Sequence, residues 1–318
     1  MNAAAQVCPQ IDLGPYYGGS PGAAEAIAAS IDRALRSTGF FMVTNHAVAP
    51  ATVEAMSCAC RAFFDLPLAE KMAIRNTASG SQRGYVPFGD SALAFTYGAS
   101  SPPDLKESFA MGPPALPQGE AAGECYAPNV WPARPVEFRA AVEAYYAAMG
   151  DLARDLLRLF ALALSMPEDF FDAGMAGHNS TLRAFNYPDL DATPLPGQLR
   201  AGEHTDYGLL TLLAGDAAPG GLQVRNRAGQ WFDVVPPAGA FVVNIGDLMM
   251  YWTNDVWLSN VHRVAVPPAD RAGSTRRQSI AYFANPREDV RVECLPTCIA
   301  PGQAPRNPPV GAGEHRVR

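Results

Sequence analysis

The sequence predicts an α+β protein in which an α/β N-terminal part precedes a mainly β C-terminal core. Helical periodicity recurs between residues 25 and 165, whereas after Thr181 short apolar runs alternate with glycine and proline turn signals. The 318 residues are 48% hydrophobic and 17% charged, which supplies a packed core and excludes a disordered or low-complexity chain. At ~150 residues per domain, the length allows two domains or one large β-barrel domain.

The elements of the N-terminal part follow from local patterns. Residues 9–13 form a short extended piece, and apolar side chains spaced as on one helix face predict a helix over 25–38, which Gly39 ends. Residues 40–44 are a continuous apolar run and predict a buried strand. A second helix is expected over 51–64. These elements together predict an α/β start of the chain.

The middle of the chain connects this part to the β core. Glycine and proline are dense from residue 79 to 135, which predicts irregular connections, and the longest helical pattern then covers 137–165. Strands are predicted at 209–213, 222–224, 241–245, 261–266 and 279–283. Regular short strands of this kind indicate a barrel or sandwich. We therefore divide the chain into an N-terminal region (1–135), a connecting long helix (136–180) and a β core (181–318).

Charge and composition restrict the class of function. Lys and Arg number 24 against 31 Asp and Glu, and the net charge of −7 argues against nucleic acid or an anionic membrane as a partner. The first ten residues have neither the basic nor the apolar segment of a signal peptide, and no apolar run of ~18 residues occurs, so we expect a cytoplasmic protein. The six scattered cysteines are then expected to be reduced thiols.

The candidate metal ligands include two of the five histidines. His204 and Asp206 are separated by one residue, and on a strand such residues point to one face, ~6.6 Å apart. With His262 they form a set of two imidazoles and one carboxylate, which is the facial set of non-haem Fe(II) oxygenases and leaves coordination positions open. An isolated His-x-Asp also fits a hydrogen-bonded pair at a strand end. His46 ends the first strand and is interpreted as structural.

A second pair of residues strengthens the metal hypothesis. Arg277 and Ser279 also share one strand face, where a guanidinium fork and a hydroxyl can bind the distal carboxylate of a dicarboxylate. Fe(II) with one aspartate carries +1 and 2-oxoglutarate carries −2, so Arg277 restores neutrality in a low-dielectric barrel. Arg276 and Arg271 stay open as substitutes, although only Arg277 has a serine two positions on.

An ordered series of short motifs extends from about Pro9 to about Pro309. Its members are Gly39-Phe-Phe-Met-Val-Thr-Asn-His46, Arg83-Gly-Tyr-Val-Pro87, Lys106-Glu-Ser-Phe109, Pro128-Asn-Val-Trp-Pro132, Asn186-Tyr-Pro188, His204-Thr-Asp-Tyr-Gly208, Leu222-Gln-Val224, Val243-Asn-Ile-Gly-Asp247, His262-Arg-Val264 and Arg277-Gln-Ser279. This series resembles the isopenicillin N synthase-like family of Fe(II)/2-oxoglutarate-dependent oxygenases, over nearly the whole chain.

The resemblance implies a double-stranded β-helix (jelly-roll) core that carries the iron, preceded by a mostly helical N-terminal region. It implies metal ligation by His204, Asp206 and His262. The implied activity is oxidation of a small-molecule substrate with O2, in which 2-oxoglutarate is converted to succinate and CO2. Hydroxylation is the expected outcome, and desaturation or cyclisation also occur in this family.

The same resemblance assigns 2-oxoglutarate binding to Arg277 and Ser279, with Tyr187 near the cosubstrate. Arg183 lies in an expected core strand, where an inward arginine needs an anionic partner, either a substrate carboxylate or a structural salt bridge. Tyr85 and Phe88 lie in the glycine-rich segment that could roof the pocket, as substrate contacts or as ordinary packing.

Asn244 and Asp247 precede the last metal ligand in the chain and are interpreted as a strand-end turn. Two functional alternatives stay open. An oxidase of the same fold would take all four electrons from its substrate without 2-oxoglutarate. A non-catalytic metal- or ligand-binding module is the second, although an intact triad together with Arg277-x-Ser279 argues against it.

Overall fold

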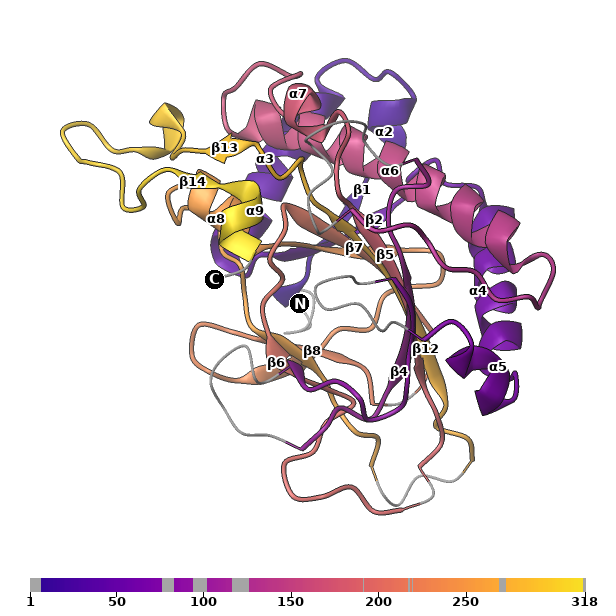
Figure 1. Ribbon diagram of the computed structural model, residues 1–318. Coiled ribbons are helices and arrows are strands. Elements are labelled where there is room, and N and C mark those ends of the chain that lie inside the picture. Colours follow the sequence, from indigo (N-terminus) through magenta and orange to yellow (C-terminus); the bar gives the residue numbers. More distant parts are fainter. Residues whose placement is uncertain are drawn as a thin grey trace.

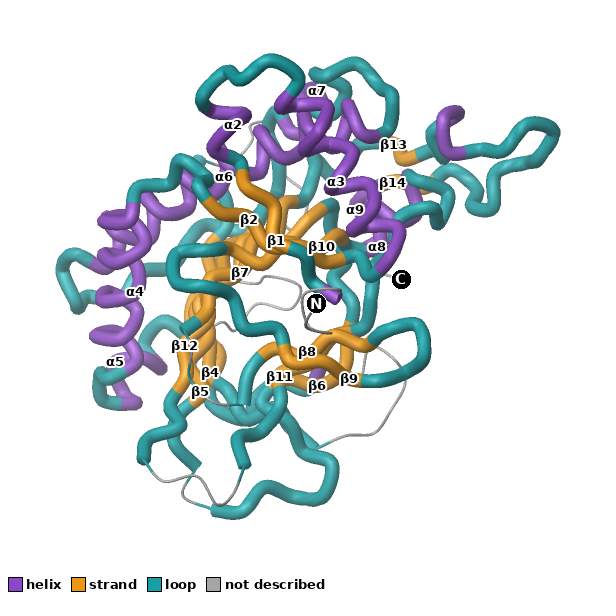
Figure 2. Tube along the Cα trace, turned by 180° about the vertical axis from the view of Figure 1, so that it is seen from behind, coloured by secondary structure: helices purple, strands orange, loops and turns teal. Residues whose placement is uncertain are grey.

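Two facing sheets form the core of the protein, and the jelly-roll prediction is confirmed. The computed structural model describes residues 7–75, 83–93, 102–115, 126–190, 192–216, 218, 220–268 and 273–316. Figures 1 and 2 show the small sheet lying opposite the large one, with helices covering the outer side of the large sheet. The space between the sheets is therefore the interior of the barrel.

Among the described residues the large sheet has eight strands, and both parts of the chain contribute to it. In spatial order they are β1 (Gln10–Asp12), β2 (Phe40–Thr44), β10 (Phe241–Ile245), β7 (Leu210–Gly215), β12 (Arg277–Ala284), β5 (Thr181–Tyr187), β4 (Glu107–Met111) and β3 (Gly84–Val86). Neighbouring strands are antiparallel except for β1 and β2. Strands of the N-terminal part thus flank the C-terminal strands on both sides. The division at 1–135, 136–180 and 181–318 stays a prediction.

The small sheet contains strands of the C-terminal part. Its spatial order is β6 (Ala201–His204), β11 (His262–Val264), β8 (Leu222–Arg225) and β9 (Trp231–Asp233). A separate pair, β13 (Arg291–Val292) and β14 (Val310–Gly311), lies outside the barrel (Figure 1). Apolar side chains fill part of the space between the two sheets, and they include Phe40, Met42, Leu222, Val224 and Val242.

Three long helices cover the outer face of the large sheet. They are α3 (Ala23–Ser37), α4 (Pro50–Phe64) and α6 (Phe138–Ala163), and α6 contacts the other two and the sheet (Figure 1). Short helices are α2 (Gly14–Tyr17), α5 (Leu68–Met72), α7 (Asp172–Met175), α8 (Asp247–Trp252), α9 (Ala312–Arg316) and the 3-10 turn η3 (Pro296–Cys298). Phe138 of α6 packs 4.8 Å from Phe63 and 4.9 Å from Phe109 between ring centroids, so aromatic rings join helix and sheet.

Most elements expected from local patterns are present within a few residues of their predicted ends, because each has a clear apolar period. The segment 79–135 is the exception, since β3 and β4 lie inside it. Strand β4 is buried on both faces but begins with the polar residues Glu107 and Ser108, so the sequence shows neither an apolar run nor an alternation that would mark it. Glycine and proline density alone therefore gave the wrong prediction there.

Two smaller expectations concern the thiols and the membrane. The cysteines at positions 8, 58, 60, 294 and 298 are free, in agreement with the expected reduced thiols. Within the described ranges, no helix combines the length and apolar character needed to cross a bilayer.

Gly39 offers a test of the turn that connects α3 to β2. Its φ is +76°, and a Cβ there would lie 1.9 Å from the Leu258 carbonyl oxygen. We expect Gly39→Ala to lower the free energy of unfolding by about 2–4 kcal/mol, because conformational strain and a backbone clash add. Gly19 is the matched control: its φ is +65° with nothing within 4 Å, so Gly19→Ala should cost only about 1 kcal/mol. If urea unfolding shows that both variants lose the same free energy of unfolding, the clash at Gly39 is contradicted.

Candidate metal centre and adjoining pocket

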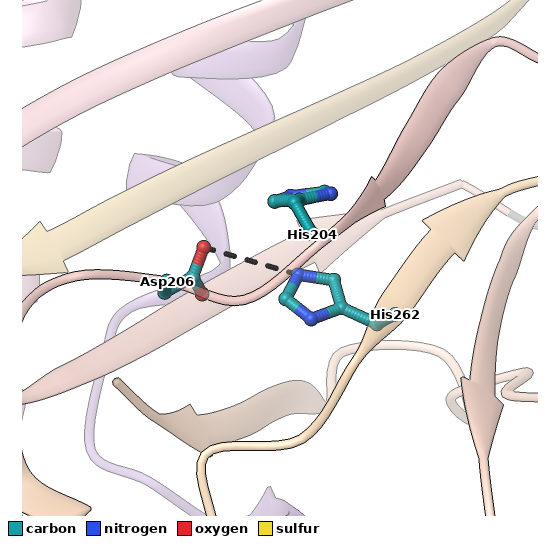
Figure 3. A group of neighbouring side chains, drawn as sticks. All are labelled: His204, Asp206 and His262. Carbon is teal, nitrogen blue, oxygen red and sulfur yellow. Dashed lines mark ion pairs between the residues drawn. The ribbon is translucent and has the colours of Figure 1, made fainter. Parts of the chain in front are cut away.

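Three candidate ligands from the small sheet and the loop beside it converge on one point inside the barrel. His204 ends β6 and His262 begins β11, and these two residues are directly paired across the antiparallel ladder. Asp206 lies in the loop after β6. One ligand atom from each residue lies within 4.8 Å of the others, and His262 Nε2 is 3.8 Å from Asp206 Oδ1 (Figure 3). These distances suit a single ion bound between the three side chains.

The sequence argument for this convergence was only partly right. It placed His204 and Asp206 on one strand face, but β6 ends at His204 and Asp206 lies beyond it. The carboxylate reaches the imidazoles because the loop after β6 turns toward β7 and β10, where hydrogen-bond donors hold it.

Backbone carbonyls fix the orientation of both imidazoles. His204 Nδ1 lies 2.7 Å from the Gly202 oxygen, and His262 Nδ1 lies 3.1 Å from the Asn260 oxygen. A carbonyl only accepts, so each Nδ1 carries the hydrogen and each Nε2 keeps its lone pair. The two Nε2 atoms are therefore prepared as metal ligands.

Two side chains of the large sheet orient the Asp206 carboxylate. Thr211 Oγ1 donates to Asp206 Oδ2 at 2.6 Å, and Asn244 Nδ2 donates to the same oxygen at 2.7 Å. The other oxygen, Oδ1, faces the imidazoles. Interpreting Asn244 as part of a strand-end turn was therefore incomplete, because its side chain positions a candidate ligand. Its place on β10, a different strand, left no local sequence signal for this contact.

The ionisation states of His204 and Asp206 match those required of metal ligands. Burial, with the neighbouring His262, lowers the pKa of His204 to about 3. Burial acts to raise the pKa of Asp206, but the two imidazoles and the donors Thr211 and Asn244 hold it below its usual value. At neutral pH the site thus presents a neutral imidazole and a carboxylate, and this donor set of two imidazoles and one carboxylate suits Fe(II).

A cavity of about 60 Å³ adjoins the three ligands, and Arg277, Ser279 and Tyr187 also line it. Arg277 and Tyr187 are directly opposite on β12 and β5, with the guanidinium carbon 5.2 Å from the Tyr187 ring centroid. Ser279 Oγ lies 3.4 Å from the Tyr187 hydroxyl. Arg277 Nε and Nη1 are buried and have no hydrogen-bond partner within the described ranges. Because buried donors are rarely left unsatisfied, these two atoms fit an anionic ligand such as a carboxylate.

The neighbouring arginines are placed differently. Arg276 points to the opposite side of the sheet, where its Nη1 lies 2.6 Å from Asp65 and its Nε donates to Asn186 at 3.0 Å. It cannot exchange roles with Arg277 without a shift of the strand register. Arg271, the other substitute considered, lies outside the described residues.

Arg200 and Lys106 both lie near this cavity, although neither was predicted as a site residue. Arg200 is fully buried, lies 5.8 Å from the Tyr187 ring centroid, and donates to the backbone carbonyls of Gly220 and Thr275. It therefore fixes the segment that leads into β12. Lys106 lines the cavity itself and forms an ion pair with Asp104. The Lys-Glu-Ser-Phe motif was the only sequence signal that pointed to this segment.

The three candidate substrate contacts lie in different surroundings. Arg183 is not among the residues that line the cavity, but it shares a row of β5 with Phe185 and Tyr187, which do. Its guanidinium lies 5.9 Å from the Phe185 ring centroid. Tyr85 is 1% exposed and belongs to the core beneath the helices, where its hydroxyl donates to Glu107 at 2.5 Å. Phe88 is 47% exposed and is not part of the cavity wall. Only Arg183 is therefore kept as a candidate.

His46 has the structural role that its position suggested. Its Nε2 lies 2.6 Å from the Gly239 carbonyl oxygen, its Nδ1 accepts from the Val48 amide at 3.3 Å, and its ring packs 4.4 Å from Phe241. Both ring nitrogens are engaged there, which makes His46 a useful control for substitutions at the metal centre.

Comparison with protein families gives two matches in chain order. Residues 8–134 match the family described as the N-terminal region of non-haem dioxygenases in morphine synthesis. Residues 179–286 match the 2OG-Fe(II) oxygenase superfamily. The second range contains all three candidate ligands and Arg277.

Individual proteins are similar over nearly the whole chain. The 2-oxoglutarate-Fe(II) type oxidoreductase hxnY of Emericella nidulans is 36% identical, over 95% of this chain and 86% of its own length. Validamycin A dioxygenase of Streptomyces hygroscopicus subsp. limoneus is 34% identical, over 96% and 84%. A full-length Neurospora crassa protein, crystallised with alpha-KG (2-oxoglutarate) and thymine, superposes with a TM-score of 0.86 and 30% identity, covering 100% of this chain and 97% of that one.

The hydrogen bond from Asn244 to Asp206 gives a test of how the metal centre is held. We expect Asn244→Ala to weaken Fe(II) binding about 10- to 100-fold, because the carboxylate loses one of two donors that orient it. Anaerobic Fe(II) titration followed by equilibrium dialysis measures this affinity. His46→Ala should bind Fe(II) as the unaltered protein does, whereas His204→Ala should lose most of it. An unchanged affinity in Asn244→Ala would show that Thr211 alone suffices.

Proposed function

The chain belongs to the 2OG-Fe(II) oxygenase superfamily, in its isopenicillin N synthase-like branch, and on that premise we propose how its own residues carry out the reaction. It is an Fe(II)- and 2-oxoglutarate-dependent oxygenase with O2 as co-substrate. When bound, the Fe(II) ion supplies O2 activation coupled to the oxidative decarboxylation of 2-oxoglutarate. The protein supplies binding, orientation and exclusion of water.

We assign metal binding to His204, Asp206 and His262. This assignment is supported by the convergence of two Nε2 atoms and one carboxylate oxygen. A hydrogen bond at the other polar atom of each side chain fixes its orientation. Such a set would hold Fe(II) and leave coordination positions open for the cosubstrate and O2. Because the ligands are already oriented, little reorganisation is needed when the ion binds.

Arg277, with Ser279 and Tyr187, is assigned to the distal carboxylate of 2-oxoglutarate. The observation that carries this proposal is the pair of buried guanidinium nitrogens, Nε and Nη1, in the wall of the cavity that also holds the three ligands. A dianion between an Fe–Asp206 unit of charge +1 and Arg277 makes the buried site neutral. Neutrality matters because an uncompensated charge in this interior would be strongly unfavourable.

The substrate of this site is proposed to be a small molecule, and hydroxylation the outcome. Validamycin A dioxygenase is named for a small molecule, and the Neurospora crassa protein holds thymine in its crystal structure. Apolar side chains make up much of the cavity wall, and they include Phe40, Leu93, Phe185, Leu213, Leu222, Val264 and Phe283. They exclude water from the reacting groups. Arg183, on the same strand row as Phe185, is the proposed polar contact for this substrate.

Stoichiometry tests the proposed function against an oxidase that uses no 2-oxoglutarate. Purified protein with Fe(II), 2-oxoglutarate and air should release succinate slowly, and a true substrate should raise this to about one succinate per oxidised product. Thymine, validamycin A, L-proline and L-homoarginine form a first substrate panel, taken from the names of relatives. Full product formation without 2-oxoglutarate or succinate would favour the oxidase.

Arg277 should determine the affinity for 2-oxoglutarate. Arg277→Ala loses a charge-assisted bidentate contact of about 1.5–3 kcal/mol, so the Kd for 2-oxoglutarate should rise about 10- to 100-fold. Arg277→Lys should recover only part of the loss, because an ammonium lacks the planar fork. The charge-transfer absorbance of the anaerobic Fe(II) complex reports this Kd. Arg276→Ala is the control and should stay within a few-fold of the unaltered enzyme; the reverse pattern would move the role to Arg276.

A further inference from the structure

We propose that Lys106, held by Asp104, is a specificity-determining substrate contact that donates to a neutral carbonyl oxygen, as in an amide, imide or ring lactam. This assignment rests on the proposed oxygenase function and adds the chemical class of its substrate. Lys106 and the three candidate metal ligands line the same cavity, which is the space where a substrate must lie.

Asp104 holds Lys106 in place within the cavity wall. The side chains of Lys106 and Asp104 are 4% and 2% exposed, and Nζ lies 2.6 Å from Asp104 Oδ2. Asp104 is itself fixed, because its Oδ1 accepts from the Gly202 amide at 2.8 Å and its Oδ2 accepts from the Leu93 amide at 3.1 Å. Gly202 is two residues before His204 on β6. The ion pair is thus tied to the strand that carries a candidate metal ligand.

The ammonium of Lys106 has more donors than the ion pair uses. An ammonium carries three hydrogens. Asp104 Oδ2 is the single hydrogen-bond partner of Nζ within the described ranges. A buried donor without an acceptor costs free energy, so an acceptor of a bound molecule is expected at this position.

The charge balance decides which acceptor fits. Lys106 and Asp104 form a neutral pair, and Arg277 already balances the cosubstrate in the proposed site. The Arg183 guanidinium, at the same Phe185 ring, is the separate polar contact proposed above. A carboxylate at Lys106 would add a negative charge close to the Asp104 carboxylate in a low-dielectric interior, which is unfavourable. A neutral carbonyl accepts the same hydrogen bond without that repulsion. The geometry therefore favours an uncharged substrate group at this end of the cavity.

Phe185 supplies the adjacent apolar surface. Its ring lines the cavity, and Lys106 Nζ lies 5.7 Å from the ring centroid. A flat molecule that packs on this ring can direct a carbonyl in its plane toward the ammonium. Planarity and a neutral carbonyl are therefore the two features that this wall selects.

Three probes of similar shape test whether Lys106 binds a neutral carbonyl, an anion or a cation. Benzamide has a neutral carbonyl, benzoate is an anion, and benzamidine is a cation without an oxygen acceptor. Each is added to the anaerobic complex of the full-length enzyme with Fe(II) and 2-oxoglutarate, and the shift of its charge-transfer band is titrated. We expect benzamide to bind most tightly, benzoate more weakly and benzamidine not at all. No response to benzamide, or a preference for either charged probe, would overturn the assignment.

Matched variants identify the residue responsible. Lys106→Met should weaken benzamide binding about 10- to 100-fold and leave the Kd for 2-oxoglutarate within about twofold. Lys71 is the control, since it is also a buried lysine, paired with Glu107 at 2.8 Å, but does not line the cavity. Lys71→Met should keep benzamide binding. Asp104→Asn should shift the preference from benzamide toward benzoate, because the repelling carboxylate is removed.

The outcomes separate this assignment from the proposed function. If Lys106→Met binds benzamide as the unaltered enzyme does, or loses affinity for 2-oxoglutarate instead, Lys106 is not a substrate contact while the oxygenase function stands. If the unaltered enzyme forms no charge-transfer band with Fe(II) and 2-oxoglutarate, the proposed function fails, and the Lys106 assignment fails with it.

Discussion

The metal pocket depends on a buried carboxylate that two neighbouring strands hold in place. Asp206 is 6% exposed, and the side-chain donors to its Oδ2 are Thr211 on β7 and Asn244 on β10. Without such donors, burial of this charge would be strongly unfavourable. With them, the second oxygen faces the imidazoles of the small sheet. The candidate metal centre is therefore also a place where the two sheets of the barrel are joined.

Successive side chains along the strands of the large sheet face the cavity and the helices in turn. The residues of the cavity wall and the polar residues beside the helices therefore lie on opposite faces of the sheet. Three residues of the large sheet, Glu107, Asn186 and Arg276, form a polar network on the helix side. Glu107 accepts hydrogen bonds from Asn186 and from Lys71 of α5, and Arg276 donates to Asn186. Each of the three sheet residues is followed or preceded in sequence by a residue of the cavity wall. These pairs are Lys106 and Glu107, Asn186 and Tyr187, and Arg276 and Arg277. Because successive side chains of a strand point to opposite faces, this network and the cavity residues occupy opposite sides of the same strands.

Prediction from the sequence succeeded where the pattern is local. The long helices have an apolar stripe, and β2, β10 and β12 are apolar runs bounded by turn signals, so they were predicted close to their observed ends. Strand β4 was missed because it begins with the polar residues Glu107 and Ser108, so its five residues show neither an apolar run nor an alternation. Strand β3 was missed because it has only three residues, the first of which is a glycine. Tyr85 was considered as a substrate contact or as ordinary packing because it lies in the glycine-rich segment, and its side chain packs in the core on the opposite face of the sheet.

The sequence by itself determined the chemical inventory: two imidazoles, a carboxylate, and an arginine with a serine two positions on, in an order that resembles one family. Those conclusions need only residue types and spacing. The tertiary structure alone decided which donors orient Asp206, which of two adjacent arginines faces the cavity, and that Lys106 forms part of its wall. The physical reason is that these contacts join strands far apart in the chain, and only the pairing register determines which side chains share a face.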